Sequence, residues 1–226
     1  SSNTSYPGPP SVAVSAFLPE CTEEDIRYIL FNFKQGKSVG LDGVSAAVLR
    51  RNFAALKSVL LAIINDIIAT QIMPSGLKEA LVVPLFKSGQ VNSVTNYRPI
   101  SILSCIALIL EKHIFQVMQT FIDAHNLLSA NQYGFTSGRG TKLALDELTD
   151  FLNNALESSE FACALFLDVS KAFDSVNHDV LLCKLHSYGF RGPFLSLLKN
   201  YLHRRSQVVV IGNIKSRPTQ LSRGVP

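Results

Sequence analysis

The sequence predicts an α+β fold in which helices pack on antiparallel strands and outnumber them. Over several long stretches, apolar residues recur every three or four positions, as on the buried face of a helix. The short β-rich runs are bounded by turn residues, and Gly212-Asn213 is a two-residue hairpin signal. Strands and helices do not alternate as they do in β-α-β units, so the α+β class is favoured over α/β.

Composition limits the class of protein. With 226 residues, 47% of them hydrophobic and 17% charged, the chain is long enough for a large core and is not disordered or collagen-like. A net charge of +4 and a pI near 8.9 permit nucleic-acid binding without requiring it. The scattered cysteines include no Cys-x-x-Cys pair, which argues against a zinc ribbon and predicts buried free thiols.

No signal for secretion or for a membrane span is expected. Residues 1–20 are interpreted as a flexible linker because Ser1–Pro10 is rich in Pro, Gly and Ser, unlike a signal peptide. The most apolar stretches, Val59–Met73 and Ile100–Leu110, are interrupted by polar residues. The sequence therefore predicts a protein that is neither secreted nor inserted in a membrane.

The amino-terminal elements are mainly helical. Thr22 is predicted to be the N-cap of a helix that runs to about Phe33. Ser45 is predicted to cap one long helix to about Thr70. The run Ala80–Phe86 is β-rich and ends in a turn, which indicates a strand.

The second half continues with a helix over 106–127, an irregular Gly-rich loop and a helix over 141–156. The unbroken apolar run that starts at Phe161 indicates a buried strand to Val169. Helices are then expected over 179–188 and 193–204, followed by a hairpin of strands over 207–211 and 214–220.

The end of the predicted strand at Asp168 is the first candidate site. A carboxylate beside a buried strand is costly unless it is paired or binds a cation. Two interpretations stay open: a ligand of a hard cation such as Mg²⁺, or a salt-bridged or capping aspartate. Asp174 is better explained as the N-cap of the helix that follows.

The segment Phe166–His178, FLDVSKAFDSVNH, resembles the first catalytic motif of reverse transcriptases from non-LTR (LINE-type) retrotransposons. The resemblance covers about Glu20 to Pro226, because other blocks follow in the order of that family. These blocks are Lys37–Val44, Leu81–Lys87 with Asn96–Ser101, Asn131–Phe135 with Gly138–Thr141, and Arg223–Pro226.

The resemblance implies part of a right-hand polymerase fold. It places the fingers at about 21–140, the first palm strand and helix at 141–176, and a return to the fingers with the start of the next palm motif at 177–226. The family's F/Y-x-D-D motif does not occur in this sequence. We therefore expect a fragment of a reverse transcriptase domain, inactive by itself.

The implied activity is RNA-directed DNA polymerisation in a retrotransposon protein. The resemblance implies nucleotidyl transfer assisted by two Mg²⁺ ions, with an RNA template, a DNA primer and deoxynucleoside triphosphates as partners. A nuclear or cytoplasmic location is implied by the family alone. The alternative is a non-catalytic nucleic-acid-binding remnant or a domesticated module.

The resemblance also assigns roles to residues. Asp168 is expected to be the catalytic metal ligand, together with the main-chain carbonyl of Val169. Lys87 and Arg98 are expected to bind the triphosphate. Phe173 takes the position of the steric gate against ribonucleotides, with plain core packing as its alternative.

The remaining candidates are basic side chains for the template backbone. Arg139 and Lys142, in and after the Gly-rich loop, are expected to contact template phosphates without reading sequence. The run His203-Arg204-Arg205 is interpreted either as an addition to this basic track or as a solvated helix end.

Overall fold

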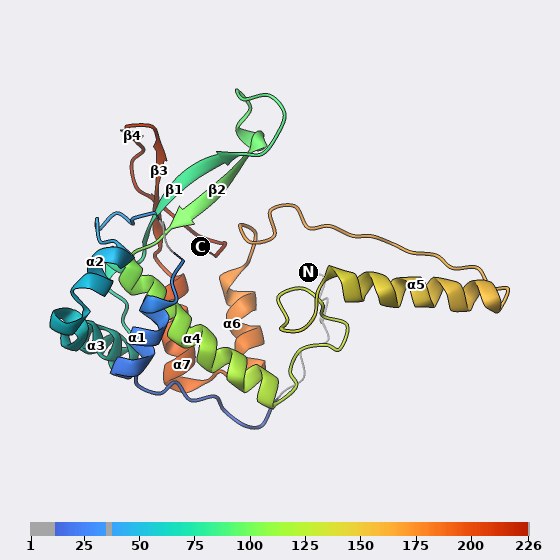
Figure 1. Ribbon diagram of the computed structural model, residues 1–226, viewed down its shortest axis with the longest axis horizontal. Helices are drawn as coiled ribbons and strands as arrows, with labels where there is room; N and C mark the ends of the chain where they lie inside the picture. The colour runs from blue at the N-terminus through green and yellow to red at the C-terminus, as the bar shows by residue number, and fades with distance from the viewer. Residues whose placement is uncertain (1–11, 35–37, 226) are drawn as a thin grey trace, which may run out of the picture. The chain divides into compact units, whose positions relative to one another are not determined.

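The computed structural model describes residues 12–34 and 38–225. It contains two compact units, one formed by the described residues up to Phe121 and from Ala172 onward, the other by Ile122–Lys171. The helices and strands shown in Figure 1 are α1 (Glu23–Phe31), α2 (Ala46–Arg51), α3 (Phe53–Thr70), β1 (Glu79–Phe86), β2 (Tyr97–Ile102), α4 (Cys105–Ala124), α5 (Thr141–Glu157), α6 (His178–Ser187), α7 (Gly192–Leu202), β3 (Ser206–Ile211), β4 (Ile214–Lys215) and β5 (Thr219–Gln220), with short 3₁₀ turns at Ser75–Leu77 and Val94–Asn96.

The predicted helix starts at Thr22 and Ser45 are confirmed. The hydroxyl of Thr22 accepts from the N–H of Asp25, and the Asp25 carboxylate accepts from the N–H of Thr22, which completes a capping box. Ser45 accepts from the N–H of Val48 at 3.2 Å. The single long helix predicted after Ser45 is divided into α2 and α3 at Asn52, where φ is −106° and ψ is 18°.

The strands of the first unit form a mixed sheet in the order β2-β1-β3-β4, and β5 pairs with β3. The strand predicted at Ala80–Phe86 and the hairpin around Gly212-Asn213 are confirmed. The antiparallel prediction holds for β1 with β2 and for β3 with β4 and β5, but β1 and β3 are parallel. Helices connect these two strands, and such a long connection permits parallel pairing.

The core of the first unit lies among the helices. Phe190 is fully buried, and its ring contacts those of Phe121 and Phe194, each at 5.3 Å between centroids. The hydroxyl of Tyr201 in α7 donates to the carboxylate of Glu111 in α4 at 2.7 Å, which links these two helices. The largest fully buried aliphatic side chains are Ile26, Leu30, Ile64, Ile67, Ile109, Leu110 and Leu197.

The described part of the segment expected to be a linker packs against this core. Ala16 and Leu18 are buried, and Ala16 forms a parallel bridge with Phe190. Arg191 donates to the main-chain carbonyl of Val12 at 2.5 Å. Residues 1–11 of that segment lie outside the described residues.

Two helices, α3 and α4, are long and apolar enough to cross a membrane by length and composition alone. Core helices meet the same criterion, and α1 packs on α3 while α4 buries His113 and several apolar side chains. These helices are weak evidence for a membrane span, and the expectation of no membrane partner stays a prediction.

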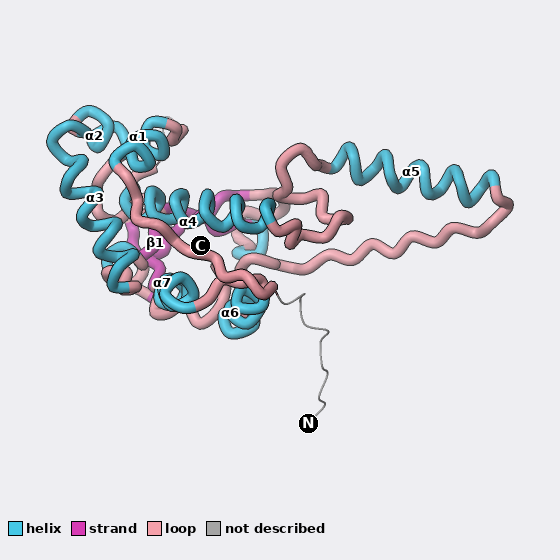
Figure 2. The backbone as a smooth tube through the Cα atoms, turned by 90° about the horizontal axis from the view of Figure 1, so that it is seen from below, coloured by secondary structure: helices cyan, strands magenta, loops and turns pink. Residues whose placement is uncertain are grey.

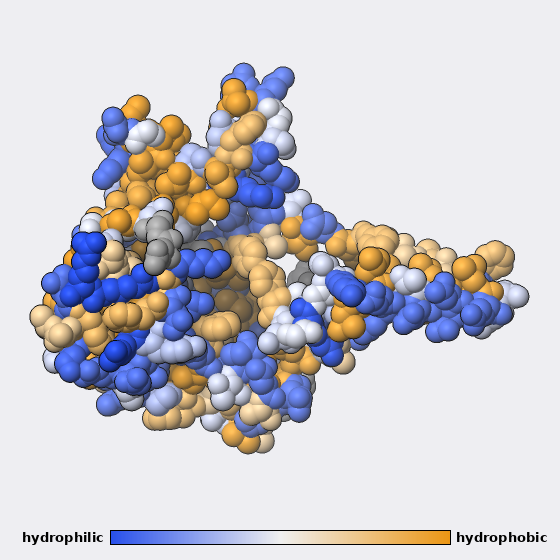
Figure 3. Space-filling model, in the orientation of Figure 1, coloured by the Kyte–Doolittle hydropathy of each residue, from blue (hydrophilic) through white to orange (hydrophobic). Residues whose placement is uncertain are grey.

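The second unit exposes most of its apolar side chains. Its helix α5 is amphipathic, and Figure 3 shows apolar side chains gathered along one side of it and polar ones along the other. Within α5, whose residues are all described, Ala155 is the only buried side chain.

The strand predicted over Phe161–Val169 is wrong. This segment has no regular secondary structure, and Figure 2 shows it as loop after α5. Phe161, Phe166 and Leu167 are all more than 80% exposed. The physical reason is the lack of a partner: among the described residues no strand pairs with this segment, so its N–H and C=O groups have no ladder to join.

The cysteine prediction is confirmed in part. All four thiols are free, but Cys21 and Cys105 are buried whereas Cys163 and Cys183 are exposed. Cys163 is exposed because it lies in the irregular segment 161–169, where a buried strand was expected.

Candidate functional site

A cavity of about 480 Å³ in the first unit brings together segments that are far apart in the sequence. Its walls come from β2 at Pro99–Ser101, from Phe173 and Asp174, from Arg205, and from the segment Leu221–Val225. The volume lies within the range of about 300–1,000 Å³ that is usual for ligand pockets. The structure therefore brings together two of the blocks noted in the sequence, around Phe173 and at Arg223–Val225.

Main-chain hydrogen bonds fasten the last described segment to the one that carries Phe173. The N–H of Val225 donates to the carbonyl of Phe173 at 3.0 Å, and the N–H of Gly224 donates to the carbonyl of Val176 at 2.8 Å. The Nε2 atom of buried His178 lies 2.7 Å from the carbonyl oxygen of Gly224. Two of these three contacts join main-chain groups, which a side-chain substitution does not remove.

Glycine is required at position 224 because the main chain there passes close to the main chain of Asp174. Its φ is +85°, and a Cβ at this position would lie 3.0 Å from the main-chain oxygen of Asp174. A side chain would be strained by both the backbone angle and the contact. The backbone angle and the close contact therefore explain why Gly224 stands in the Arg223–Val225 block.

The interpretation of 203–205 as a solvated helix end holds for His203 and Arg204, which are exposed after the end of α7, but is wrong for Arg205. Its side chain is 1% exposed, and the guanidinium lies 4.6 Å from the ring centroid of Tyr201. One of its nitrogens donates to the carbonyl of Tyr201 at 3.3 Å, whereas the Nε and second terminal nitrogen have no partner among the described residues. Burial on the cavity wall was not predictable, because neighbouring Arg204 is exposed and has the same side chain.

A second buried cation reinforces the positive charge. Lys78 is 7% exposed and donates to the carbonyl of His203 at 3.4 Å. Burial, together with the charges of Arg205 and Arg204, lowers the pKa of Lys78 below its usual range. Within the described part of the chain no carboxylate forms an ion pair with Lys78 or Arg205. Buried positive charge without a counter-ion is costly, so this region is suited to receive an anion.

The candidate triphosphate ligands Lys87 and Arg98 lie on the hairpin of β1 and β2, and both are exposed. Arg98 is opposite Leu85 in the ladder, and the N–H of Lys87 donates to the carbonyl of Asn96 at 2.8 Å. Because side chains alternate along a strand, Lys87 and Arg98 are expected on the same face of the hairpin. Arg98 directly precedes Pro99, which lines the cavity.

Phe173 lines the cavity with its side chain 61% exposed, which disagrees with plain core packing. Asp174 also lines the cavity, and its predicted role as an N-cap is wrong. The N-cap of α6 is Asn177, whose side chain accepts from the N–H groups of Asp179 and Val180. Asn177 takes this role because it directly precedes the first helical residue.

Asp168 and Val169 belong to the second unit and are exposed in the irregular segment. The burial argument for a cation at Asp168 therefore does not hold. A carboxylate oxygen and a carbonyl oxygen are donors of the kind that Mg²⁺ prefers. Among the described residues, however, no group of three potential ligands includes Asp168, so these two residues do not form a complete metal site.

Arg139 and Lys142 also belong to the second unit. The Arg139 side chain donates to the carbonyl of Ala130, and its guanidinium lies 5.6 Å from the ring centroid of Tyr133. Lys142 is exposed in the first turn of α5. Arg139 is thus held by its own loop, whereas Lys142 is open to solvent.

Comparison with known proteins places these features in context. Residues 86–226 match the family described as reverse transcriptase (RNA-dependent DNA polymerase). The chain is 32% identical over 191 residues to a probable RNA-directed DNA polymerase from transposon BS of Drosophila melanogaster, covering 84% of this chain and 21% of that protein.

Two further relatives are similar over most of the chain. Identity is 28% over 210 residues, 92% of this chain and 23% of the relative, to the RNA-directed DNA polymerase from mobile element jockey of Drosophila melanogaster. It is 25% over 204 residues, 90% of this chain and 15% of the relative, to the transposon TX1 uncharacterized 149 kDa protein of Xenopus laevis. The chain spans about a fifth of the length of the first relatives it matches.

Proposed function

Because this chain belongs to the reverse transcriptase family, we propose that it forms the nucleotide-binding part of an RNA-directed DNA polymerase encoded by a non-LTR retrotransposon. The observation that carries this proposal is the cavity of the first unit. Phe173, the Arg223–Val225 segment and the buried guanidinium of Arg205 line it together. The ligand is a deoxynucleoside triphosphate.

The charges of the cavity region favour a phosphate-bearing ligand. Arg205 is buried with N–H groups that have no partner among the described residues, and a phosphate accepts such groups in bidentate geometry. Lys87 and Arg98 on the β1–β2 hairpin add positive charge for the triphosphate. Phe173 acts as the steric gate, with its ring against C2′ of the sugar.

Asp168, through its carboxylate, and Val169, through its main-chain carbonyl, would hold a catalytic metal ion. Two bound Mg²⁺ ions would stabilise the attacking and leaving oxygens in nucleotidyl transfer. The residues of this chain bind and orient the nucleotide. The 226 residues contain no Asp-Asp pair.

An RNA template and a DNA primer are the macromolecular partners. Arg139 and Lys142 contact the template backbone through charge, and this contact weakens as salt concentration rises. Lys142 makes the larger contribution because the Arg139 side chain is already engaged by Ala130 and Tyr133.

Primer extension by the whole protein tests the proposal. Asp168→Asn abolishes extension of a DNA primer on an RNA template, whereas Asp150→Asn, a change at another exposed aspartate that lies on α5, leaves it intact. Phe173→Val lowers the preference for deoxyribonucleotides over ribonucleotides, whereas Phe161→Val does not. Equal extension by the Asp168→Asn and Asp150→Asn proteins would overturn the polymerase assignment.

A further inference from the structure

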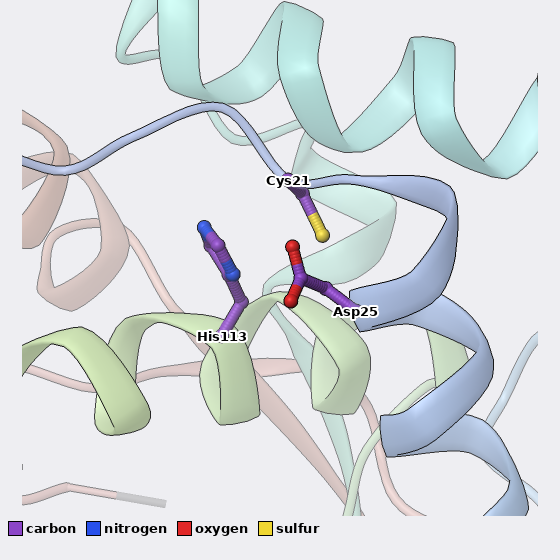
Figure 4. A group of neighbouring side chains, drawn as sticks. All are labelled: Cys21, Asp25 and His113. Atoms are coloured by element: carbon purple, nitrogen blue, oxygen red, sulfur yellow. The ribbon is translucent and has the colours of Figure 1, made fainter.

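A cluster of three potential metal ligands lies in the first unit, apart from the residues that line the cavity. Cys21 directly precedes the capping residue of α1, Asp25 is in the first turn of α1, and His113 is in α4. Their sulfur, oxygen and nitrogen atoms all lie within 4.8 Å of one another. Figure 4 shows the three side chains turned toward a common space.

The three side chains converge without bonding to each other. Within the described residues no hydrogen bond or ion pair joins Cys21, Asp25 or His113 to another member of the cluster. In tetrahedral geometry, zinc bonds of about 2.0–2.3 Å hold two ligand atoms roughly 3.3–3.8 Å apart. Side-chain rotations that close a gap of up to about 1–1.5 Å would therefore bring all three onto one ion. We propose that Cys21, Asp25 and His113 bind a single Zn²⁺ ion.

The imidazole of His113 is oriented for this role. Its Nε2 atom lies 3.0 Å from the carbonyl oxygen of Pro19, so Nε2 carries the proton and donates it to that oxygen. The lone pair is then on Nδ1, the ring nitrogen that Figure 4 shows on the side of Asp25. A histidine that binds a metal through one nitrogen and donates the other N–H to a carbonyl is the usual arrangement in zinc sites.

The carboxylate of Asp25 is also held in place by hydrogen bonds, through one of its two oxygens. Its Oδ2 accepts from the N–H of Thr22 at 2.8 Å and from the hydroxyl of Thr22 at 2.6 Å. These bonds leave Oδ1 for an ion. Burial alone would raise the pKa of Asp25, but the bonds to Thr22 and the nearby His113 hold this pKa below its usual range, so the group is ionised.

Asn65 of α3 holds the main chain of Cys21. The N–H of Cys21 donates to Oδ1 of Asn65 at 2.8 Å, and Nδ2 of Asn65 donates to the carbonyl of Cys21 at 3.0 Å. The thiol is therefore presented from a rigid position. Sequence spacing gave no signal for the cluster, because its third ligand comes from a different helix.

The donor set selects the metal. Thiolate, imidazole and carboxylate are zinc ligands, whereas Mg²⁺ and Ca²⁺ prefer oxygen donors alone. One thiolate and one carboxylate balance the charge of Zn²⁺, which lowers the cost of burying the site. The bound ion would tie the start of α1 to α4.

Zinc binding must displace the thiol proton. Burial, and secondarily the charge of Asp25, raises the pKa of Cys21 to about 12 in the metal-free chain. The coordinated sulfur is a thiolate, so one proton leaves to solvent for each ion bound.

Titration of the metal-free purified chain with Zn²⁺ tests the site, and Co²⁺ serves as a coloured substitute that reports thiolate coordination. We expect one ion per chain and a Co²⁺–thiolate absorption band. Cys21→Ser and His113→Gln are each expected to weaken binding by at least about 100-fold, since even residues that only orient zinc ligands affect affinity 10- to 100-fold.

Cys183→Ser is the matched control, because it removes an exposed free thiol on α6 and should leave binding unchanged. Equal binding by the wild-type and Cys21→Ser chains would overturn the proposal, as would loss of binding in Cys183→Ser alone. If His113→Gln does not fold, Cys21→Ser and the thiolate band of the wild-type chain decide the question.

Discussion

The helices α3 in the first unit and α5 in the second have similar lengths, 18 and 17 residues, but α3 is the more apolar helix and their surroundings differ. α3 buries Phe53, Leu60, Ile64, Ile67 and Ile68, whereas α5 buries Ala155. Both are helices because their sequences favour helix locally. Burial, by contrast, depends on partners elsewhere in the chain, and α3 has them in α1 and α2.

Two apolar runs that both predict a strand also differ in whether they find a pairing partner. The run at β1 is paired on both sides, with β2 and β3. The run over 161–169 is unpaired among the described residues and remains irregular. An apolar run thus becomes a strand only where a neighbouring strand accepts its hydrogen bonds.

The largest expected effect comes from truncating an aromatic ring in each unit. Phe190→Ala is expected to lower the free energy of unfolding by about 3–5 kcal/mol, because Phe190 is fully buried between Phe121 and Phe194. Phe161→Ala, at a fully exposed ring, should change it by less than about 0.5 kcal/mol. Urea unfolding of both variants measures the difference, and equal losses would break the comparison.

A glycine pair gives a smaller contrast. Gly224→Ala is expected to cost about 1–3 kcal/mol because φ is +85° and the main chain of Asp174 is close. Gly134→Ala in the second unit meets nothing within 4 Å and should be neutral or stabilising by up to about 1 kcal/mol. Thermal unfolding of the two variants compares them; a larger loss for Gly134→Ala would show that its loop is packed.

Helix caps sharpen the comparison further. Thr22→Ala removes the side-chain cap of α1 and should cost about 1 kcal/mol. The N-cap of helix α5 is Gly140, which provides no side-chain cap, so Gly140→Ser should add a few tenths of a kcal/mol. Helicity by circular dichroism, followed through urea unfolding, reports both; no loss in Thr22→Ala would mean that the capping box is not formed in solution.

The smallest effect is a pH dependence of that cap. The folded-state pKa of Asp25 is held below its unfolded value, so its contribution to stability is complete above about pH 4 and is lost as pH falls through the folded pKa. The penalty for Thr22→Ala should therefore shrink in acid. Unfolding free energies measured between pH 7 and pH 2.5 test this, and a constant penalty would contradict the assignment of the Thr22–Asp25 bonds.

The sequence was informative wherever structure is local. Thr22 and Ser45 cap helices through their own side chains, and Gly212-Asn213 forms a hairpin by its backbone preference, so no distant residue is needed. Pairing between β1 and β3, in contrast, joins strands far apart in the chain. Strand β2 escaped prediction because it contains Pro99 and polar residues that suit an edge strand.

For the candidate site, the sequence blocks indicated Phe173 and Arg223–Val225 but not the fold that joins them. Arg205 could not be distinguished from Arg204, because burial is decided by packing against Tyr201 and the cavity wall. The role of Asp168 stays a prediction from family resemblance, since the structure leaves it exposed.

Equilibrium binding of a deoxynucleoside triphosphate with Mg²⁺ to the purified chain tests the nucleotide cavity most directly. Arg205→Met removes the charge-assisted hydrogen bonds to the nucleotide and should weaken its binding about 10- to 100-fold. The same change should not lower the folding stability, because the buried charge of Arg205 has no counter-ion in the free chain. Arg204→Met, the exposed neighbour, should change the affinity less than about twofold. Equal affinities of the Arg205→Met and Arg204→Met chains, or no nucleotide binding by the folded wild-type chain, would contradict the account.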